Sequence, residues 1–236
     1  MDNTPLVSVI IAVRNGERFL ASAINSVLAQ DYRPLEIIVV DGRSTDKTAQ
    51  IAQSFSRVRY IEQQERGIPD AYNIGIDAAQ GELIAFLSHD DRWTPDKLSV
   101  QVKYITEHPE IQYTVARMKF FLEQDQPTPS GFRPELLQDD HVGRVMETLV
   151  VRKSLFAKIG LFRTDLSTAE DVEWFARAND HGIKMAIIPK VLLYKRVHDS
   201  NSSLTLENNR NLLKALRHSV QRKRTDSSSG SRSAHQ

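Results

Sequence analysis

The chain contains no cysteine among its 236 residues. This absence excludes a disulfide framework, a thiolate metal site and a cysteine nucleophile. Lysine and arginine together number 31, against 30 aspartates and glutamates, so the formal net charge is +1. Because nucleic-acid binders usually have a strong basic excess, we expect no nucleic-acid partner.

Long apolar runs are also missing. No stretch approaches the roughly 20 apolar residues that span a bilayer. The first five residues, Met1-Asp2-Asn3-Thr4-Pro5, do not resemble the basic start of a signal peptide. We therefore expect a cytoplasmic protein, long enough for one large α/β domain or two small ones.

Glycine-rich phosphate loops are the third absence. The chain has no Walker A motif, and no G-x-G-x-x-G follows its first apolar run. A phosphate-bearing ligand would therefore lack a glycine cradle and would need a cation in its place.

Three short apolar runs, each ending in a polar cluster, are the main positive feature. Residues 7–13 lead into Arg14-Asn15-Gly16-Glu17, residues 35–40 into Asp41-Gly42-Arg43-Ser44-Thr45-Asp46, and residues 83–87 into Ser88-His89-Asp90-Asp91. Such runs, each followed by a helical pattern, predict parallel strands of an α/β sheet buried on both faces. Because ligands bind outside the carboxyl ends of these strands, the three clusters should converge on one crevice.

The second half of the chain is less regular. We predict a mobile loop at residues 124–140 and a helix at residues 169–181. Further strands are predicted at residues 111–122, 144–152, 185–188 and 191–197. Residues 206–224 have the pattern of a basic surface helix, and residues 227–236 that of a disordered tail.

Two acidic pairs are candidates for chemistry. Asp90-Asp91 ends the third polar cluster, and hard cations such as Mg²⁺ and Mn²⁺ take carboxylate and phosphate oxygens together. Glu170-Asp171 opens a predicted helix, where a carboxylate can act as a general base. Both pairs also have a simpler interpretation, because acids cap loops and are favoured in the first turn of a helix.

Three further residues have two interpretations each. Asp41 directly follows a strand and can accept hydrogen bonds from a ribose or a base, but Asp-Gly is also a common turn. Asp70 lies in a first helical turn, where the helix dipole favours a carboxylate. His198 follows the last predicted strand and can contact metal or phosphate, or can be an ordinary surface histidine.

Taken in order, these motifs resemble the family 2 glycosyltransferases of the GT-A fold, over about residues 5–203. The resemblance is specific because five blocks occur in the family's order. The blocks are Val7-Ser8-Val9-Ile10-Ile11 with Asn15-Gly16; Ile37-Ile38-Val39-Val40-Asp41-Gly42 with Ser44-Thr45-Asp46; Gly67-Ile68-Pro69-Asp70-Ala71-Tyr72-Asn73-Ile74-Gly75; Gly81-Glu82-Leu83-Ile84-Ala85-Phe86-Leu87-Ser88-His89-Asp90-Asp91; and Glu170-Asp171 with Tyr194-Lys195-Arg196-Val197-His198-Asp199-Ser200-Asn201-Ser202.

The resemblance implies a nucleoside-diphosphate sugar as donor, with a UDP-sugar favoured, and Mn²⁺ or Mg²⁺ as cofactor. Asp91 would be the direct metal ligand, and His198 would lie near the diphosphate and the metal. Asp171 would be the catalytic base, with Glu170 as the less favoured candidate. The residues that would bind the nucleotide-sugar are Ala12, Arg14, Asn15, Asp41, Asp70, Asn73 and Asp90.

The sequence departs from the family at three positions. Ala12 stands where the family usually has proline, and Arg14 stands where an aromatic residue is frequent, so a guanidinium would stack on the base. Ser88 replaces the first acid of the D-x-D motif, and His89 occupies its variable position. The change at Ser88 removes a carboxylate that often contacts the ribose, whereas Asp90 and Asp91 are retained.

The resemblance further implies an α/β fold with a mixed, mainly parallel Rossmann-like sheet, flanked by helices, and a second smaller sheet region towards the C-terminus. Residues 1–206 would form a single GT-A domain, with donor binding in residues 1–110 and acceptor binding in residues 111–206. Residues 207–236 would form the basic helix and the tail. For residues 217–224 a solvated helix face is the simpler interpretation, and peripheral contact with the inner face of a membrane is the alternative.

The implied reaction is an inverting single displacement. Asp171 would take the proton of an acceptor hydroxyl as its oxygen attacks the anomeric carbon, and the nucleoside diphosphate would leave. The acceptor would be a glycan or a lipid-linked sugar in polysaccharide, lipopolysaccharide or other glycan synthesis. Two alternatives stay open: a sugar nucleotidyltransferase, for which Arg14-Asn15-Gly16 is a poor phosphate loop, and a non-catalytic nucleotide-binding protein.

Overall fold

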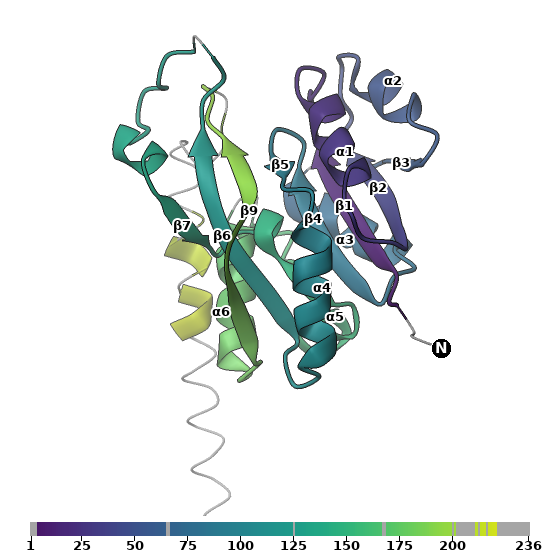
Figure 1. Ribbon diagram of the computed structural model, residues 1–236, viewed down its shortest axis with the longest axis vertical. Helices are drawn as coiled ribbons and strands as arrows, with labels where there is room; N and C mark the ends of the chain where they lie inside the picture. Colours follow the sequence, from purple (N-terminus) through teal and green to yellow (C-terminus); the bar gives the residue numbers. More distant parts are fainter. Residues whose placement is uncertain are drawn as a thin grey trace, which may run out of the picture.

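The three apolar runs form adjacent parallel strands, as predicted. They are β1 (Val7–Val13), β2 (Leu35–Asp41) and β4 (Leu83–Ser88), and β3 (Val58–Glu62) extends the parallel set beyond β2. The computed structural model describes residues 4–64, 67–124, 126–166, 169–199, 201, 211, 213–215 and 217–220. Within these residues the carboxyl ends of β1, β2 and β4 lie at the same edge of the sheet (Figure 1).

The later strands continue the same sheet, in the order β3-β2-β1-β4-β8-β6-β9-β5, with β7 paired to β6. β8 (Val150–Arg152) joins β4 to β6 (Tyr113–Phe121) by antiparallel pairing on both sides. β9 (Met185–Arg196) is parallel to β6, and β5 (Arg92–Trp93) and β7 (Asp140–Gly143) are antiparallel edges. The C-terminal sheet region expected from the sequence is therefore the β6–β7–β9 side of one continuous sheet (Figure 1).

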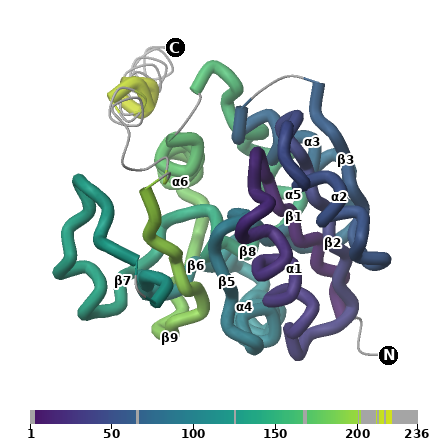
Figure 2. The backbone as a smooth tube through the Cα atoms, turned by 90° about the horizontal axis from the view of Figure 1, so that it is seen from above, coloured from purple at the N-terminus to yellow at the C-terminus, as the bar shows by residue number. Residues whose placement is uncertain are grey.

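Helices cover both faces of the sheet (Figure 2). One face is covered by α1 (Leu20–Leu28), α2 (Thr48–Gln53) and α4 (Lys97–Glu107), and the other by α3 (Ile68–Ala78), α5 (Ser154–Ile159) and α6 (Glu170–Asp180). Along β1, Val9 and Ile11 pack into the first layer and Ile10 into the second. Burial on both faces explains why this strand is apolar apart from Ser8.

Three predicted strands differ from the structure. Of residues 144–152, Met146–Thr148 form a short 3₁₀ helix, η2, and only Val150–Arg152 form a strand. The two late strands are one strand, β9, whose pairing with β6 shifts register around Pro189. Proline cannot donate to the ladder, so a bulge at this point keeps the strand continuous.

The predicted loop at 124–140 contains one further 3₁₀ helix, η1 (Pro134–Leu137). The predicted tail at 227–236 and much of the predicted basic helix lie outside the described residues. Of that helix, residues 211, 213–215 and 217–220 are helical, and Lys214 Nζ donates to the Asp165 carbonyl at 2.7 Å. Among the described helices, none is both long and apolar enough to cross a membrane.

Lys97, in the first turn of α4, is fully buried. Its Nζ has no hydrogen-bond partner among the described residues and lies 4.2 Å from the centroid of the Trp93 ring. Burial lowers the pKa of Lys97 well below its ordinary value. A lysine with a lowered pKa binds fewer protons in the folded than in the unfolded protein. Stability therefore rises with pH between the pKa of the folded protein and that of the unfolded protein.

Replacing Lys97 with methionine should therefore stabilise the protein. We expect the free energy of unfolding to rise by about 1–3 kcal/mol at neutral pH, the usual penalty of an unsatisfied buried polar group. The gain should shrink towards pH 10, since the unfolded lysine then also becomes neutral. Urea unfolding at both pH values tests this, with Lys103→Met on the exposed face of α4 as control. Equal effects of the two variants would contradict it.

Candidate active site

A cavity of about 610 Å³ lies at the carboxyl ends of the parallel strands, where the three polar clusters meet. Arg14 and Asn15 follow β1, Gly42 follows β2, and His89 and Asp90 follow β4. The remaining lining residues are Ala12, Val13, Gln63, Gly67, Ile68, Ala71, Tyr72, Ser88 and His198. The convergence expected from the strand pattern is confirmed, and we call this space the donor cavity.

Hydrogen bonds between two loops shape one wall of the donor cavity. Asn15, with a left-handed φ of 51°, accepts a hydrogen bond from Thr45 N through its side chain, at 2.9 Å. Its own N–H donates to Ser44 Oγ at 2.8 Å. The neighbouring Gly16 packs so closely that a Cβ would lie 2.8 Å from the His89 ring. The loops after β1, β2 and β4 are therefore held together.

Asp41 does not line the donor cavity, although the next residue, Gly42, does. Its side chain is buried, and one carboxylate oxygen accepts hydrogen bonds from the N–H and hydroxyl of Ser44, at 3.0 and 2.5 Å. The other oxygen accepts from the Tyr60 hydroxyl at 2.8 Å. In this geometry Asp41 fixes the loop that carries Gly42.

The two predicted nucleotide contacts on α3 also lie outside the lining of the donor cavity. Asn73 makes two hydrogen bonds of 2.9 Å to the backbone N–H and carbonyl of Phe162. Both ends of its amide are thereby used to join α3 to the segment before α6. Asp70 accepts a 3.4 Å hydrogen bond from Gln63, which does line the cavity. The structure thus places Asp70 behind a cavity residue and gives Asn73 a structural contact.

Of the two adjacent acids after β4, Asp90 faces the donor cavity. Its Oδ2 lies 2.8 Å from Nε2 of His198, which also lines the cavity. Burial tends to raise the pKa of Asp90, but the hydrogen bond from His198 and the nearby charges of His89 and Lys195 outweigh it and lower the pKa below its ordinary value. Asp90 is therefore an ionised carboxylate beside an imidazole.

Asp91 does not line the donor cavity and is 1% exposed. Its Oδ1 accepts from the backbone N–H of Arg196 at 2.8 Å, and its Oδ2 pairs with Lys195 Nζ at 3.1 Å. The expectation that Asp91 is the direct metal ligand does not fit this geometry, since both oxygens already have partners in the protein interior. Asp90 and His198 are better placed for that role.

The described residues contain no group of three or more His, Cys, Asp or Glu side chains that could hold a metal ion alone. Asp90 and His198 nevertheless supply a carboxylate oxygen and an imidazole nitrogen at 2.8 Å from each other, on the cavity wall. Mg²⁺ is usually held by one or two carboxylates together with substrate phosphates. The donor set therefore fits a divalent cation that is shared with a diphosphate.

Behind Asp90 lies a buried acidic network around one lysine. Lys195 Nζ pairs with Asp91 Oδ2 at 3.1 Å and with Glu147 Oε1 at 3.2 Å, and Ser88 donates to the same Glu147 oxygen at 2.5 Å. Glu147 has a 9% exposed side chain. Burial works against the protonated form of Lys195, but Asp91 and Glu147 outweigh it and raise its pKa well above the ordinary value.

Glu170 and Asp171 open α6 and join this network electrostatically. Burial, with repulsion from Asp171, raises the pKa of Glu170 to about 8. Burial and repulsion from Glu147 raise the pKa of Asp171 to about 6. Asp171 is also the more exposed of the two. Two neighbouring buried carboxyl groups with raised pKa values favour a state in which the pair holds a proton.

Sequence reasoning missed Glu147 and Lys195. Glu147 is 59 residues away from its partner Ser88, and Lys195 is 104 residues away from Asp91. Lys195 lies inside the motif that runs from Tyr194 to Ser202, so its position gave a signal, whereas no pattern around Glu147 marks it.

Residues 8–163, more than half of the chain, match the family described as Glycosyl transferase family 2. The chain belongs to this family. An uncharacterized glycosyltransferase of Rickettsia typhi is 32% identical over 222 residues, which cover 87% of this chain and 68% of that protein. The family and its relatives support a glycosyltransferase function and not a sugar nucleotidyltransferase.

Two similar solved structures show the same GT-A fold. S. aureus TarS in complex with UDP-GlcNAc has a TM-score of 0.74 at 21% identity, over 92% of this chain and 66% of that one. The mannosyltransferase PcManGT from Pyrobaculum calidifontis, in complex with GDP-Man and Mn²⁺, has the same TM-score and identity, over 92% and 64%. Another TarS structure is matched over only 36% of its length, so this chain is much shorter than that protein.

Proposed function

We propose that this chain transfers a sugar, with inversion, from a nucleoside-diphosphate sugar to a hydroxyl of a glycan or lipid-linked acceptor. The observation that carries the proposal is the donor cavity, which has the Asp90–His198 pair on its wall. A pocket of 300–1,000 Å³ suits a small-molecule or cofactor ligand, and a metal-binding pair on its wall suits a diphosphate. UDP-GlcNAc and GDP-Man in two structures of the same fold support this donor class.

In the proposed complex the nucleoside lies along Ala12, Arg14 and Asn15, and the diphosphate lies towards Asp90 and His198. The planar guanidinium of Arg14 can stack on the base. A Mn²⁺ or Mg²⁺ ion held by Asp90 and His198 would neutralise charge on the departing diphosphate. No covalent intermediate is needed, and positioning supplies much of the acceleration.

Asp171 takes the proton of the acceptor hydroxyl as that oxygen attacks the anomeric carbon. Its pKa of about 6 leaves it ionised at neutral pH yet basic enough to accept a proton. Burial raises the pKa of Asp91, Glu170 and Asp171, and Lys195 opposes the rise in each. Lys195 thereby helps to keep the base ionised inside a buried acidic network.

The donor is identified by a panel of UDP- and GDP-sugars, each incubated with and without Mn²⁺, with release of nucleoside diphosphate as the readout. Metal-dependent release from one donor, accelerated by a glycan acceptor, is the expected result. Binding of nucleotides without any turnover on the whole panel would instead favour the non-catalytic alternative.

Replacing each of the two adjacent acids separately tests which one binds the metal. Asp90→Asn should abolish the gain in UDP affinity that Mn²⁺ gives, because this carboxylate faces the donor cavity. Asp91→Asn should retain most of that gain, because both of its oxygens are used in the interior. Calorimetric titrations of UDP with Mn²⁺ and with chelator measure the gain. If only Asp91→Asn loses the gain in UDP affinity, Asp91 is the direct metal ligand, as the sequence predicted.

A further inference from the structure

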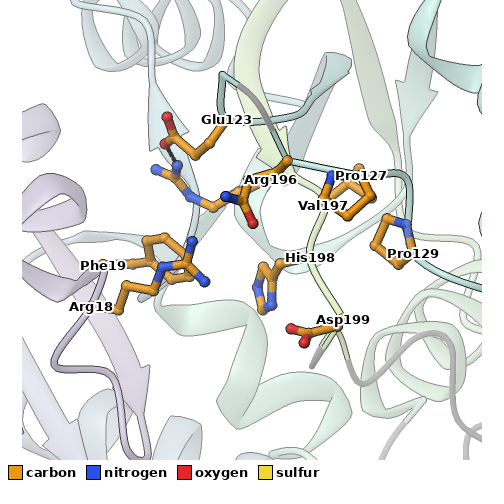
Figure 3. Close-up of a pocket in the computed structure, with 10 residues that line it drawn as sticks. Arg18, Phe19, Glu123, Pro127, Pro129, Arg196, Val197, His198 and Asp199 are labelled. Atoms are coloured by element: carbon orange, nitrogen blue, oxygen red, sulfur yellow. Dashed lines mark ion pairs between the residues drawn. The ribbon is translucent and has the colours of Figure 1, made fainter.

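A second, smaller cavity lies beside the donor cavity and shares His198 with it. Its volume is about 110 Å³, well below the roughly 300–1,000 Å³ of cavities for drug-sized ligands. It is formed by the turn before α1, the loop after β6 and the end of β9 (Figure 3). Its lining includes Arg18, Phe19, Glu123, Pro127, Arg196 and Asp199.

One wall of this cavity is an alternating stack of guanidinium groups and rings. The Phe19 ring has Arg18 at 4.6 Å and Arg196 at 4.4 Å from its centroid. Arg196 also lies 4.7 Å from the centroid of Phe121, and Arg92 lies 4.5 Å from that ring. Because two guanidiniums already contact Phe19, its ring is not a free platform for stacking a sugar. The stack instead holds polar groups in fixed positions.

Arg196 ties this wall to the donor cavity. Its guanidinium Nε donates to the Asp90 carbonyl at 2.7 Å, and its side chain is 2% exposed. The His198 ring, bonded to the Asp90 carboxylate at 2.8 Å, stands 5.2 Å from Phe19, centroid to centroid. His198 therefore separates the two cavities, and a ligand in the smaller one lies across the imidazole from Asp90.

The smaller cavity is lined by two arginines, Arg18 and Arg196, and by two acids, Glu123 and Asp199, so these charges cancel. Arg196 forms an ion pair with Glu123. Arg18 and Asp199 make no hydrogen bond or ion pair with any other described residue, and Figure 3 shows both directed towards the space beside His198. Within the described part of the chain, the lining thus offers one unpaired guanidinium and one unpaired carboxylate.

This combination suits an uncharged ligand that has neighbouring hydroxyl groups. A hydroxyl can donate to a carboxylate and accept from a guanidinium, and such charge-assisted hydrogen bonds are the stronger ones. A phosphate or carboxylate would gain Arg18 but would meet repulsion from Asp199 and Glu123. A neutral sugar residue uses both groups without this cost.

We propose that the smaller cavity binds an uncharged sugar residue of the acceptor, through a pair of neighbouring hydroxyls held by Arg18 and Asp199. This inference rests on the proposed glycosyl transfer. It makes the acceptor a neutral glycan, and it makes Arg18 and Asp199 residues that determine acceptor specificity.

The test is saturation-transfer NMR with simple probes, recorded with and without UDP and Mn²⁺. The neutral probes are methyl glycosides of glucose, galactose and mannose, and the charged probes are methyl glucuronide and glycerol phosphate. We expect at least one neutral glycoside to bind and the charged probes to bind more weakly. Stronger binding of the charged probes would overturn the inference, since the cavity would then be an anion site.

Variants locate the binding. Arg18→Gln and Asp199→Asn should each weaken binding of the neutral glycoside by about tenfold or more, the usual effect of losing a charge-assisted hydrogen bond. Arg57→Gln and Asp139→Asn change exposed residues of the same types elsewhere and should have no effect. UDP affinity should be unchanged in all four variants. Equal glycoside binding in all of them would remove the smaller cavity from acceptor recognition.

The measurements with UDP and Mn²⁺ distinguish failure of the acceptor inference from failure of the proposed glycosyltransferase function. A wild-type protein that binds UDP with Mn²⁺ but binds no glycoside overturns the acceptor inference and leaves the proposed function standing. A wild-type protein that binds none of the nucleotides counts against the proposed function. Glycoside binding that depends on Arg18 and Asp199 would in that case still support a saccharide site.

Discussion

Replacing Lys195 with methionine should lower the free energy of unfolding by about 3–5 kcal/mol, the usual effect of removing one partner of a buried ion pair. Lys195 is the cation between Asp91 and Glu147, whose side chains are 1% and 9% exposed. Without it, two buried carboxyl groups lose their counter-charge. The matched control is Lys190→Met on the same strand, whose ion pair with Asp96 is solvent-exposed and contributes at most about 1 kcal/mol.

The loss in Lys195→Met should grow with pH. Burial already raises the pKa of Asp91, and removal of Lys195 raises it further. An acid whose pKa is higher in the folded than in the unfolded protein takes up a proton on folding, so the folded state loses stability as pH rises. Urea unfolding at pH 5 and pH 8 measures this dependence. A loss no larger than that of Lys190→Met would contradict a buried network centred on Lys195.

A second substitution identifies the partner. If Asp91 is the group left without a counter-charge, Asp91→Asn should restore part of the stability in the Lys195→Met background. The same change alone should destabilise the wild type, because it removes the carboxylate that pairs with Lys195. This opposite sign in the two backgrounds is the coupling that a double-mutant cycle detects.

The sheet and the crevice could be predicted because their signals are local. β1, β2 and β4 are apolar runs that are buried on both faces, and each ends in polar residues. The parallel arrangement then brings those ends to one edge without any knowledge of side-chain contacts. Arg14, Asn15 and Asp90 were found in this way, and all three line the donor cavity.

The sequence could not predict which of the side chains that follow a strand face the donor cavity. Asp90 and Asp91 are adjacent, and which one faces the cavity depends on the backbone turn after β4 and on hydrogen bonds from Arg196, more than 100 residues away. Asn73 likewise uses its amide on Phe162, 89 residues away. Contacts at such separations leave no periodic pattern in a single sequence, and for the same reason Glu147 was missed.

Replacing Asp171 with asparagine should reduce sugar transfer by about 10²- to 10⁴-fold, the range typical of lost general-base catalysis. Asparagine keeps the shape of the side chain but cannot accept the proton. The hydrogen bond that Asp171 Oδ1 accepts from the N–H of Val172, at 2.7 Å, can be kept by the amide oxygen. Neither Asp171 nor its neighbour Glu170 lines the donor cavity, so UDP affinity should be nearly unchanged.

The pH profile tests the same assignment independently of the size of the loss. Burial raises the pKa of Asp171 to about 6, and a base must be deprotonated to act. Wild-type transfer should therefore fall as pH decreases through about 6, and the residual activity of Asp171→Asn should lack that limb. A residue that only supports the fold would change the rate without removing the limb.

Glu170→Gln is the matched control, because it changes the adjacent carboxyl group on the same helix. Adjacent helical positions point about 100° apart, so the two side chains cannot present themselves to an acceptor equally. Glu170 is also the more buried member, and its pKa of about 8 keeps it protonated at neutral pH. Glu170→Gln should therefore cost much less activity and should preserve the pH limb. An inactive Glu170→Gln beside a nearly wild-type Asp171→Asn would reverse the assignment, and full activity in both would exclude α6 from the chemistry.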